Sequence, residues 1–295
     1  MERTISATPR HSEDELKQLF TKTLKLSSLW YAYEMLKDDS AFCDLPFSEQ
    51  FYELGKVCHQ KRLDNKYKLL KKDSNIPASE MIQPASELAK SNGVTISKIE
   101  LAVNRLIQPE QGIVIVNGPA GTGKSTFGIS ILDHVMKMGY KTSYYDYTCE
   151  MMMLTSMYDR RDAYNERLSR IYCNKIIVLD DFLLNNTSST SLLSQSSDTA
   201  STCSREITCL KELLDSCRAN GCSIIILSQL TIDTWYERII ADCKNSKFAA
   251  LAVDAVMDRL LADPLIINLK GQSRRRKGKL QKVDMEVSDL KDLKK

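Results

Sequence analysis

The stretch from residue 118 to residue 126 has the residue types that bind the phosphates of a nucleotide. Its sequence is GPAGTGKST, and it follows an apolar run at residues 112–117. Glycines let consecutive backbone N–H groups curve around a phosphate without a Cβ clash, and the positive end of the following helix adds to the attraction. In this interpretation Lys124 contacts the β- and γ-phosphates of ATP, and Ser125 binds Mg²⁺. The residues expected to line the nucleotide are Gly118, Pro119, Ala120, Gly121, Thr122, Gly123, Lys124, Ser125 and Thr126.

Three polar side chains follow other apolar runs. Asp180 and Asp181 come after residues 175–179, and Gln229 comes after residues 222–228. In α/β folds, ligands bind at the carboxyl ends of the strands. We expect Asp180 to hold Mg²⁺ through the water shell of the ion. Asp181 is expected to orient or deprotonate the attacking water, and Gln229 to sense the γ-phosphate or hold that water. The alternatives are a buried strand that merely ends in an acidic turn, and an ordinary glutamine at a strand end.

Apolar strands alternate with helical segments along most of the chain, which predicts an α/β fold with a parallel sheet and helices on both faces. Two further interpretations concern this region: Met151, Met152 and Met153 are core residues, and the serine- and threonine-rich residues 183–204 are a loop. The predicted strands are residues 112–117, 141–146, 175–180 and 222–229. The predicted helices are residues 124–138, 150–157, 163–170 and a segment that runs from about Ile207 to a stop at Asn220 and Gly221.

The first part of the chain is predicted to be a small helical domain. Residues 12–15, SEDE, have the form of a capping box, and a long helical stretch follows Pro46. That stretch is basic, which predicts contact with the phosphates of double-stranded DNA without sequence readout; a solvated helix face is the alternative. The residues expected to contact DNA are Lys61, Arg62, Lys66 and Lys68. The predicted domains are residues 1–80 for DNA binding and assembly, residues 81–278 for the ATPase, and residues 279–295 as a charged tail.

Composition narrows the function classes. The 295 residues are enough for about two domains, and the formal net charge of +3 means that any nucleic-acid contact must come from a local basic patch. Nine cysteines occur without a C-x-x-C pair, which favours reduced thiols over disulfides or a zinc site. No apolar run has the length of a signal peptide or a membrane span, so we expect a cytoplasmic protein.

Three later motifs carry a family resemblance. Residues 227–236 (LSQLTIDTWY), 254–260 (DAVMDRL) and 266–275 (IINLKGQSRR), together with the tandem aspartates, resemble the IstB-like ATPases. These are AAA+ helpers of insertion-sequence transposases and are related to the DnaC helicase loaders. The resemblance covers about residues 15–277. It implies an AAA+ P-loop core in which Gln229 is a sensor, Arg259 is an arginine finger inserted into a neighbouring subunit, and Arg275 is a second sensor. For that last role Arg274 and Arg276 remain alternatives.

The resemblance implies an ATP-dependent helper that assembles as a homo-oligomer on double-stranded DNA, recruits a transposase and is disassembled by ATP hydrolysis. A replicative helicase loader is the closest alternative. A P-loop small-molecule kinase is a weaker alternative, because kinases work without a neighbour's arginine, and the motif with Arg259 and the basic helical domain speak against it. An ATP-gated scaffold without hydrolysis is also weaker, because the pair Asp180 and Asp181 is intact.

Overall fold

The computed structural model describes residues 11–79, 82–184, 199–242 and 247–270. The chain divides into two compact units, Met1–Leu69 and Leu70–Lys295. Arg274, Arg275, Arg276, the tail at residues 279–295 and most of the predicted loop lie outside the described residues. The functional division into residues 1–80, 81–278 and 279–295 stays a prediction.

The first unit is helical. It contains α1 (Glu13–Gln18), a π-helical turn η1 (Leu19–Thr23), α2 (Ser27–Leu36), α3 (Ser40–Cys43) and the beginning of α4 (Phe47–Asp73). The predicted capping box is present, because the Ser12 hydroxyl accepts a hydrogen bond from the backbone N–H of Glu15 (3.2 Å) and the Glu15 carboxylate accepts one from the N–H of Ser12 (3.0 Å). The buried apolar residues are few, chiefly Trp30 on α2 and Cys58 on α4, so this unit has a small core.

The second unit is built on a five-stranded sheet. Its strands are β1 (Ile113–Asn117), β2 (Thr142–Asp146), β3 (Ile176–Asp180), β4 (Ser223–Ser228) and β5 (Pro264–Asn268), in the order β2-β3-β4-β1-β5. Every neighbouring pair is parallel. β1, β3 and β4 are apolar over almost their whole length because both faces of the sheet are covered.

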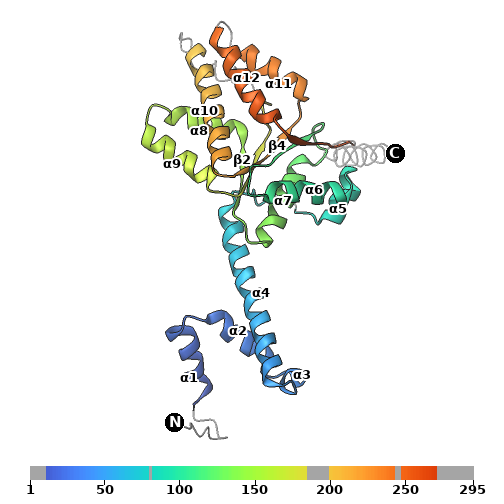
Figure 1. The fold of residues 1–295 in the computed structure, drawn as a ribbon, viewed down its shortest axis with the longest axis vertical. Helices are drawn as coiled ribbons and strands as arrows, with labels where there is room; N and C mark the ends of the chain where they lie inside the picture. Colours follow the sequence, from blue (N-terminus) through green and yellow to red (C-terminus); the bar gives the residue numbers. More distant parts are fainter. Residues whose placement is uncertain (1–10, 80–81, 185–198, 243–246, 271–295) are drawn as a thin grey trace, which may run out of the picture. The chain divides into compact units, whose positions relative to one another are not determined.

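Helices cover both faces of this sheet, as Figure 1 shows. On one face lie α6 (Ile96–Ile107) and α7 (Lys124–Lys137), preceded by α5 (Ala85–Asn92). Helix α7 lies so close to the sheet that a Cβ on Gly128 would be 3.0 Å from the side chain of Leu227 on β4. The other face packs against α8 (Tyr147–Met157), α9 (Arg161–Tyr172) and α10 (Thr199–Ala219), together with α11 (Ile232–Asp242) and α12 (Lys247–Leu261). The predicted fold class, an α/β core with a parallel sheet and helices on both faces after a helical N-terminal region, is confirmed.

Three details differ from the predictions. β5 was not predicted, and it pairs with β1 at the edge of the sheet. α10 begins at Thr199, so the last residues of the predicted loop are helical. Only Met151 of the three methionines is a core residue, whereas Met152 and Met153 are 55% and 45% exposed. Three consecutive helix residues are about 100° apart, so a helix with one buried face cannot bury all of them.

Candidate functional site: a nucleotide site at the carboxyl edge of the sheet

The phosphate-binding loop connects the end of β1 to the start of α7. Gly121 and Gly123 have φ values of 79° and 89°, a region where a side chain is strained. A Cβ on Gly118 would be 2.8 Å from the backbone oxygen of Leu269, which follows β5. Glycine is therefore required at these three positions, and the backbone N–H groups at the start of α7 border the loop.

Lys124, the first residue of α7, lies over this loop. Its Nζ donates hydrogen bonds to the backbone oxygens of Gly118 (2.8 Å) and Pro119 (3.0 Å), and the residue is 6% exposed. The Thr122 hydroxyl also donates to the oxygen of Pro119 (2.8 Å). Ser125 and Thr126 are partly buried in the first turn of the helix. The ammonium group is thus held against the backbone of the loop by two carbonyl oxygens, at the start of the helix.

The two aspartates lie at the end of β3, and their backbones differ. Asp180 is the last residue of the strand and is 6% exposed, whereas Asp181 has a left-handed φ of 52°. Oδ1 of Asp180 accepts a hydrogen bond from the backbone N–H of Asp181 (2.8 Å), and Oδ2 accepts one from the hydroxyl of Tyr144 on β2. Burial raises the pKa of Asp181 above its ordinary value of 3.8, and the charge of Asp180 raises it further.

Gln229 meets the second aspartate. It follows β4, the strand next to β3, and its Nε2 donates a hydrogen bond to Oδ1 of Asp181 (3.1 Å). The carboxylate and the amide expected to handle the attacking water are therefore in contact. A neutral donor on this carboxylate opposes the rise of its pKa.

Ser228, which sequence reasoning missed, holds this part of the site together. Its buried hydroxyl donates to the backbone oxygen of Phe182 (3.2 Å) and accepts from the N–H of Leu230 (3.1 Å) and from Nε1 of Trp235 (3.2 Å). Phe182 packs edge to face against both Trp235 and Tyr147, with ring centroids 4.8 Å and 4.7 Å apart. The segments that carry Asp181 and Gln229 are thereby fixed to each other and to α11.

These residues fit a nucleotide with a hard divalent cation. The glycine positions leave room that a Cβ would fill, and the oxygen donors Ser125 and Asp180 are the type that Mg²⁺ prefers. Within the described ranges, no group of three or more histidine, cysteine or acidic side chains could hold a metal alone. A magnesium ion at this site would therefore share its ligands with phosphates and water, as Mg²⁺ commonly does.

A family model described as IstB-like ATP binding protein matches residues 20–282. The chain belongs to this family of IstB-like ATP-binding proteins. Among curated proteins, none matches the chain. Solved structures similar to it include the DnaC helicase loader, which is 17% identical over 67% of this chain and 97% of that chain, with a TM-score of 0.39. DnaI is 14% identical over 68% of this chain and 90% of that chain, with a TM-score of 0.42. AMPPCP-bound DnaA from Aquifex aeolicus is another, at 14% identity, 69% of this chain, 54% of that chain and a TM-score of 0.42.

In this IstB-like protein the predicted arginine finger is engaged within its own chain. Arg259 on α12 forms a two-pronged ion pair with Asp215 on α10: its Nε bonds to Oδ1 and its Nη2 to Oδ2 (3.1 Å). Its Nη1 donates to the backbone oxygen of Ala255 (2.6 Å). The hydrogen bonds from Arg259 lower the pKa of Asp215. The proposed second sensor, Arg275, lies outside the described residues.

The residues predicted to contact DNA do not share one face of α4. The ammonium of Lys61 lies over the ring of Tyr31, 3.8 Å from its centroid, whereas Arg62, Lys66 and Lys68 are exposed. Arg62 and Lys66 are four residues apart and lie on one face, but Lys68 is rotated by about 200° from Lys66. A single straight duplex lying along the helix would meet Arg62 and Lys66 together.

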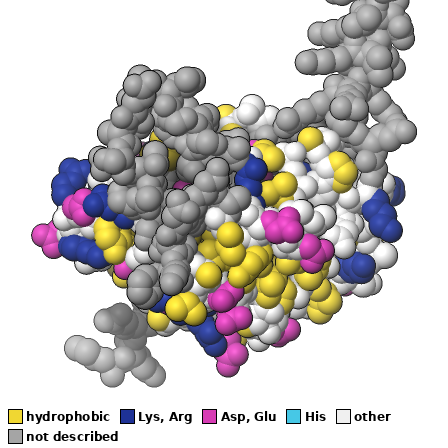
Figure 2. All heavy atoms as spheres, turned by 90° about the horizontal axis from the view of Figure 1, so that it is seen from above, with side chains coloured by type: hydrophobic (Ala, Val, Ile, Leu, Met, Phe, Trp, Pro, Cys, Tyr) yellow, Lys and Arg dark blue, Asp and Glu magenta, His cyan; other side chains and the backbone are white. Residues whose placement is uncertain are grey.

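The surface of the described residues adds no continuous basic face in the view of Figure 2, where Lys and Arg side chains are interspersed with acidic and apolar ones. In the described part of the chain, every helix is too short or too polar to cross a membrane.

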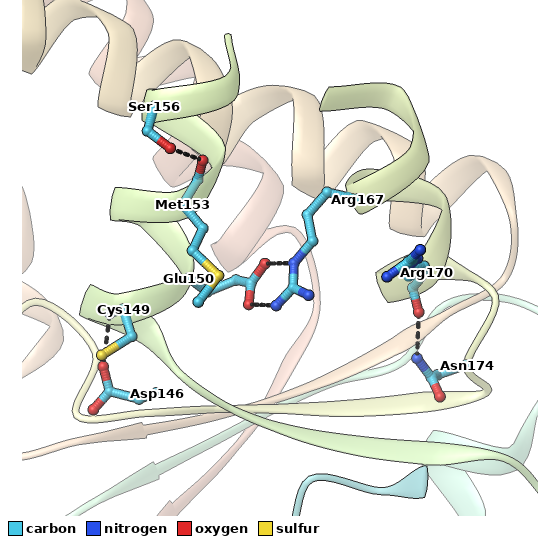
Figure 3. A network of polar contacts seen from close by, with 8 residues as sticks. All are labelled: Asp146, Cys149, Glu150, Met153, Ser156, Arg167, Arg170 and Asn174. Atoms are coloured by element: carbon cyan, nitrogen blue, oxygen red, sulfur yellow. Dashed lines mark hydrogen bonds and ion pairs between the residues drawn. The ribbon is translucent and has the colours of Figure 1, made fainter. Parts of the chain in front are cut away.

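A network of polar contacts, shown in Figure 3, supports the strand that ends beside the aspartates. Asp146, the last residue of β2, caps α8 by accepting from the N–H of Cys149 (2.8 Å). Glu150 on α8 is buried and forms a two-pronged pair with Arg167 on α9, at 2.7 Å and 2.5 Å. Asn174, after α9, accepts a hydrogen bond from the Ser143 hydroxyl on β2 (3.0 Å). These contacts hold β2, α8 and α9 as one block behind the site.

Proposed function

We propose that this chain is an ATP-dependent DNA-binding helper of a transposase, which assembles on double-stranded DNA and assists insertion-sequence transposition. The observation that carries the proposal is the gathering of Lys124, the aspartates and Gln229 at one sheet edge in a member of the IstB-like ATP-binding family. In this proposal residues 1–80 contact DNA and support assembly, residues 81–278 hydrolyse ATP, and residues 279–295 form a charged tail.

ATP is bound by the loop at residues 118–126, with Lys124 on the β- and γ-phosphates. Ser125 and Asp180 hold Mg²⁺, which supplies charge neutralisation for the phosphates. Asp181 and Gln229, already hydrogen-bonded to each other, orient the attacking water. The raised pKa of Asp181 suits a group that accepts a proton during hydrolysis.

Assembly completes the ATPase site in this proposal. Arg259 of one subunit stabilises charge on the γ-phosphate bound by its neighbour, which makes hydrolysis depend on oligomerisation. The pair with Asp215 must then open when the neighbour binds. ATP binding favours the assembled form on DNA, and hydrolysis returns the subunits to the free form. The client is a transposase, and the same ATPase in a helicase loader would differ only in its client.

The test is ATP turnover by the purified chain with and without duplex DNA, for the wild type and for Lys124→Ala and Arg259→Ala. We expect DNA to change turnover, Lys124→Ala to abolish it, and Arg259→Ala to lose hydrolysis while still binding ATP. Arg170→Ala is the matched control, because Arg170 is an exposed arginine whose ion pair with Glu166 is also on the surface. Turnover that ignores DNA, together with a silent Arg259→Ala, would refute the proposal.

The client is tested separately. The chain is mixed with a candidate partner transposase and, in parallel, with the replicative helicase of the same cell. ATP-dependent co-elution with the transposase supports the helper function. Co-elution with the helicase alone would assign the ATPase to helicase loading.

A further inference from the structure

Tyr144 reaches the carboxylate that is proposed to hold the metal ion. It lies on β2, where it is paired with Val178 of β3, and Asp180 is two residues further along β3. Residues two apart on a strand lie on the same face, so Tyr144 and Asp180 are diagonal neighbours on the α7 face of the sheet. The tyrosine hydroxyl donates its hydrogen bond to Oδ2 of Asp180.

The backbone at Tyr144 is held as well. β2 is an edge strand, and the N–H of Tyr144 donates to the backbone oxygen of Ser74 (2.8 Å), a residue of the same unit that is fully buried. A side chain that leaves an anchored strand keeps its hydroxyl in one place. The donor is therefore built into the fold and does not depend on an exposed loop.

Both oxygens of the Asp180 carboxylate are held by donors, which determines how the group points. Oδ1 receives the N–H of Asp181 at 2.8 Å and Oδ2 receives the hydroxyl of Tyr144. An ionised carboxylate has about four lone-pair sites, so each oxygen keeps one for the water shell of a cation. The two hydrogen bonds orient the carboxylate without filling its acceptor capacity.

We infer that Tyr144 is a positioning residue of the metal–nucleotide site: it orients the Asp180 carboxylate toward the divalent cation that accompanies the nucleotide. The inference rests on the proposed function of the site. Partners of ligating carboxylates typically contribute 10–100-fold to metal affinity, because the ligand otherwise has to be ordered when the metal binds. Tyr144 has no contact with the phosphates in this scheme, so metal binding is affected and nucleotide binding alone is not.

Tyr145 is the matched control. It is the next residue of the same strand and is 7% exposed, but its ring lies on the opposite face, in the apolar cluster that contains Ile177 and Leu179. Burial raises the pKa of the Tyr145 hydroxyl. Tyr145→Phe removes a hydroxyl from the same strand without touching Asp180.

The experiment measures Mn²⁺ binding by electron paramagnetic resonance in the presence of a non-hydrolysable ATP analogue, and analogue binding by fluorescence in EDTA. For Tyr144→Phe we expect Mn²⁺ affinity to fall by about 10-fold, the low end of the usual range, with metal-free analogue affinity unchanged. Tyr145→Phe should match the wild type in both measurements. In an Asp180→Asn background, Tyr144→Phe should add no further loss, because it acts through that carboxylate.

Two outcomes would overturn the inference alone: wild-type Mn²⁺ affinity in Tyr144→Phe, or an equal loss of metal-free analogue binding, which a general structural role would cause. A full additional loss in the Asp180→Asn background would overturn it too. If the wild type shows no nucleotide-dependent Mn²⁺ binding, the proposed function fails together with the inference. The two failures are thus distinguishable.

Discussion

Asp215→Asn should release the arginine that is proposed to act in a neighbouring subunit. The side chains of Arg259 and Asp215 are 26% and 42% exposed, so solvent screens their attraction, although the contact is two-pronged. An ion pair this exposed contributes about 1 kcal/mol at most, which is about a five-fold change in an equilibrium. Neutralising Asp215 should therefore raise the population of released Arg259 by up to that factor.

The assay is ATP turnover as a function of protein concentration on saturating duplex DNA. If Asp215 competes with the neighbour's nucleotide for Arg259, the concentration at half-maximal turnover should fall by about five-fold in Asp215→Asn. Maximal turnover should stay at the wild-type value, because the assembled form already holds the arginine at the neighbour's site. Glu166→Gln is the control, since it removes an exposed carboxylate whose partner, Arg170, has no proposed function.

A different pattern would refute this reasoning. If Asp215→Asn loses turnover at every concentration, as Arg259→Ala is expected to do, then Asp215 holds the arginine in its working position and does not compete for it. If Glu166→Gln lowers the half-maximal concentration equally, the effect comes from net charge. An unchanged curve would mean that the pair with Asp215 does not hold Arg259 back from the neighbour's site.

Three further predictions concern stability and follow from the same structure. The pKa of Asp215 is depressed, so this residue stabilises the fold at pH values above its ordinary pKa of 3.8, and the contribution is lost as the pH falls through the depressed pKa. The difference in melting temperature between the wild type and Asp215→Asn should therefore be present at pH 7 and vanish in acid. Glu150→Ala should lower the free energy of unfolding in urea by about 3 kcal/mol, because Glu150 is 3% exposed and its pair with Arg167 is broken. Replacing both residues by leucine should recover most of that stability. An equal loss in the double variant would contradict this. Gly118→Ala should lower both the melting temperature and the ATP affinity, since the added Cβ would meet a backbone oxygen at 2.8 Å. Gly55→Ala, which has open space around it in α4, should instead stabilise the protein by about 0.5–1 kcal/mol. Calorimetry of both variants checks this contrast.

Local chemistry made part of this protein predictable from sequence. The loop at residues 118–126 depends on glycine geometry and on the start of a helix, and both are encoded within nine consecutive residues. The capping box at Ser12 and the apolar strands β1, β3 and β4 were found for the same reason, because capping and burial on two faces leave short-range patterns. The order of these elements was sufficient to predict the fold class.

Elements with a weak local pattern were missed. β5 has only five residues, begins with a proline, and forms by pairing with β1, about half the chain away. Met152 and Met153 were misassigned because a run of apolar residues does not say which of them faces the core.

The contacts that give the candidate site its detail were decided by the tertiary structure. Tyr144 meets Asp180 because β2 and β3 pair in one register, and Gln229 meets Asp181 because β3 and β4 are neighbours although 48 residues separate the two side chains. The sequence could predict that these polar groups lie at the same edge of the sheet, since the carboxyl ends of parallel strands meet at one edge. It could not predict which groups pair, because hydrogen bonds between strands depend on strand order and register, and those are determined by long-range packing.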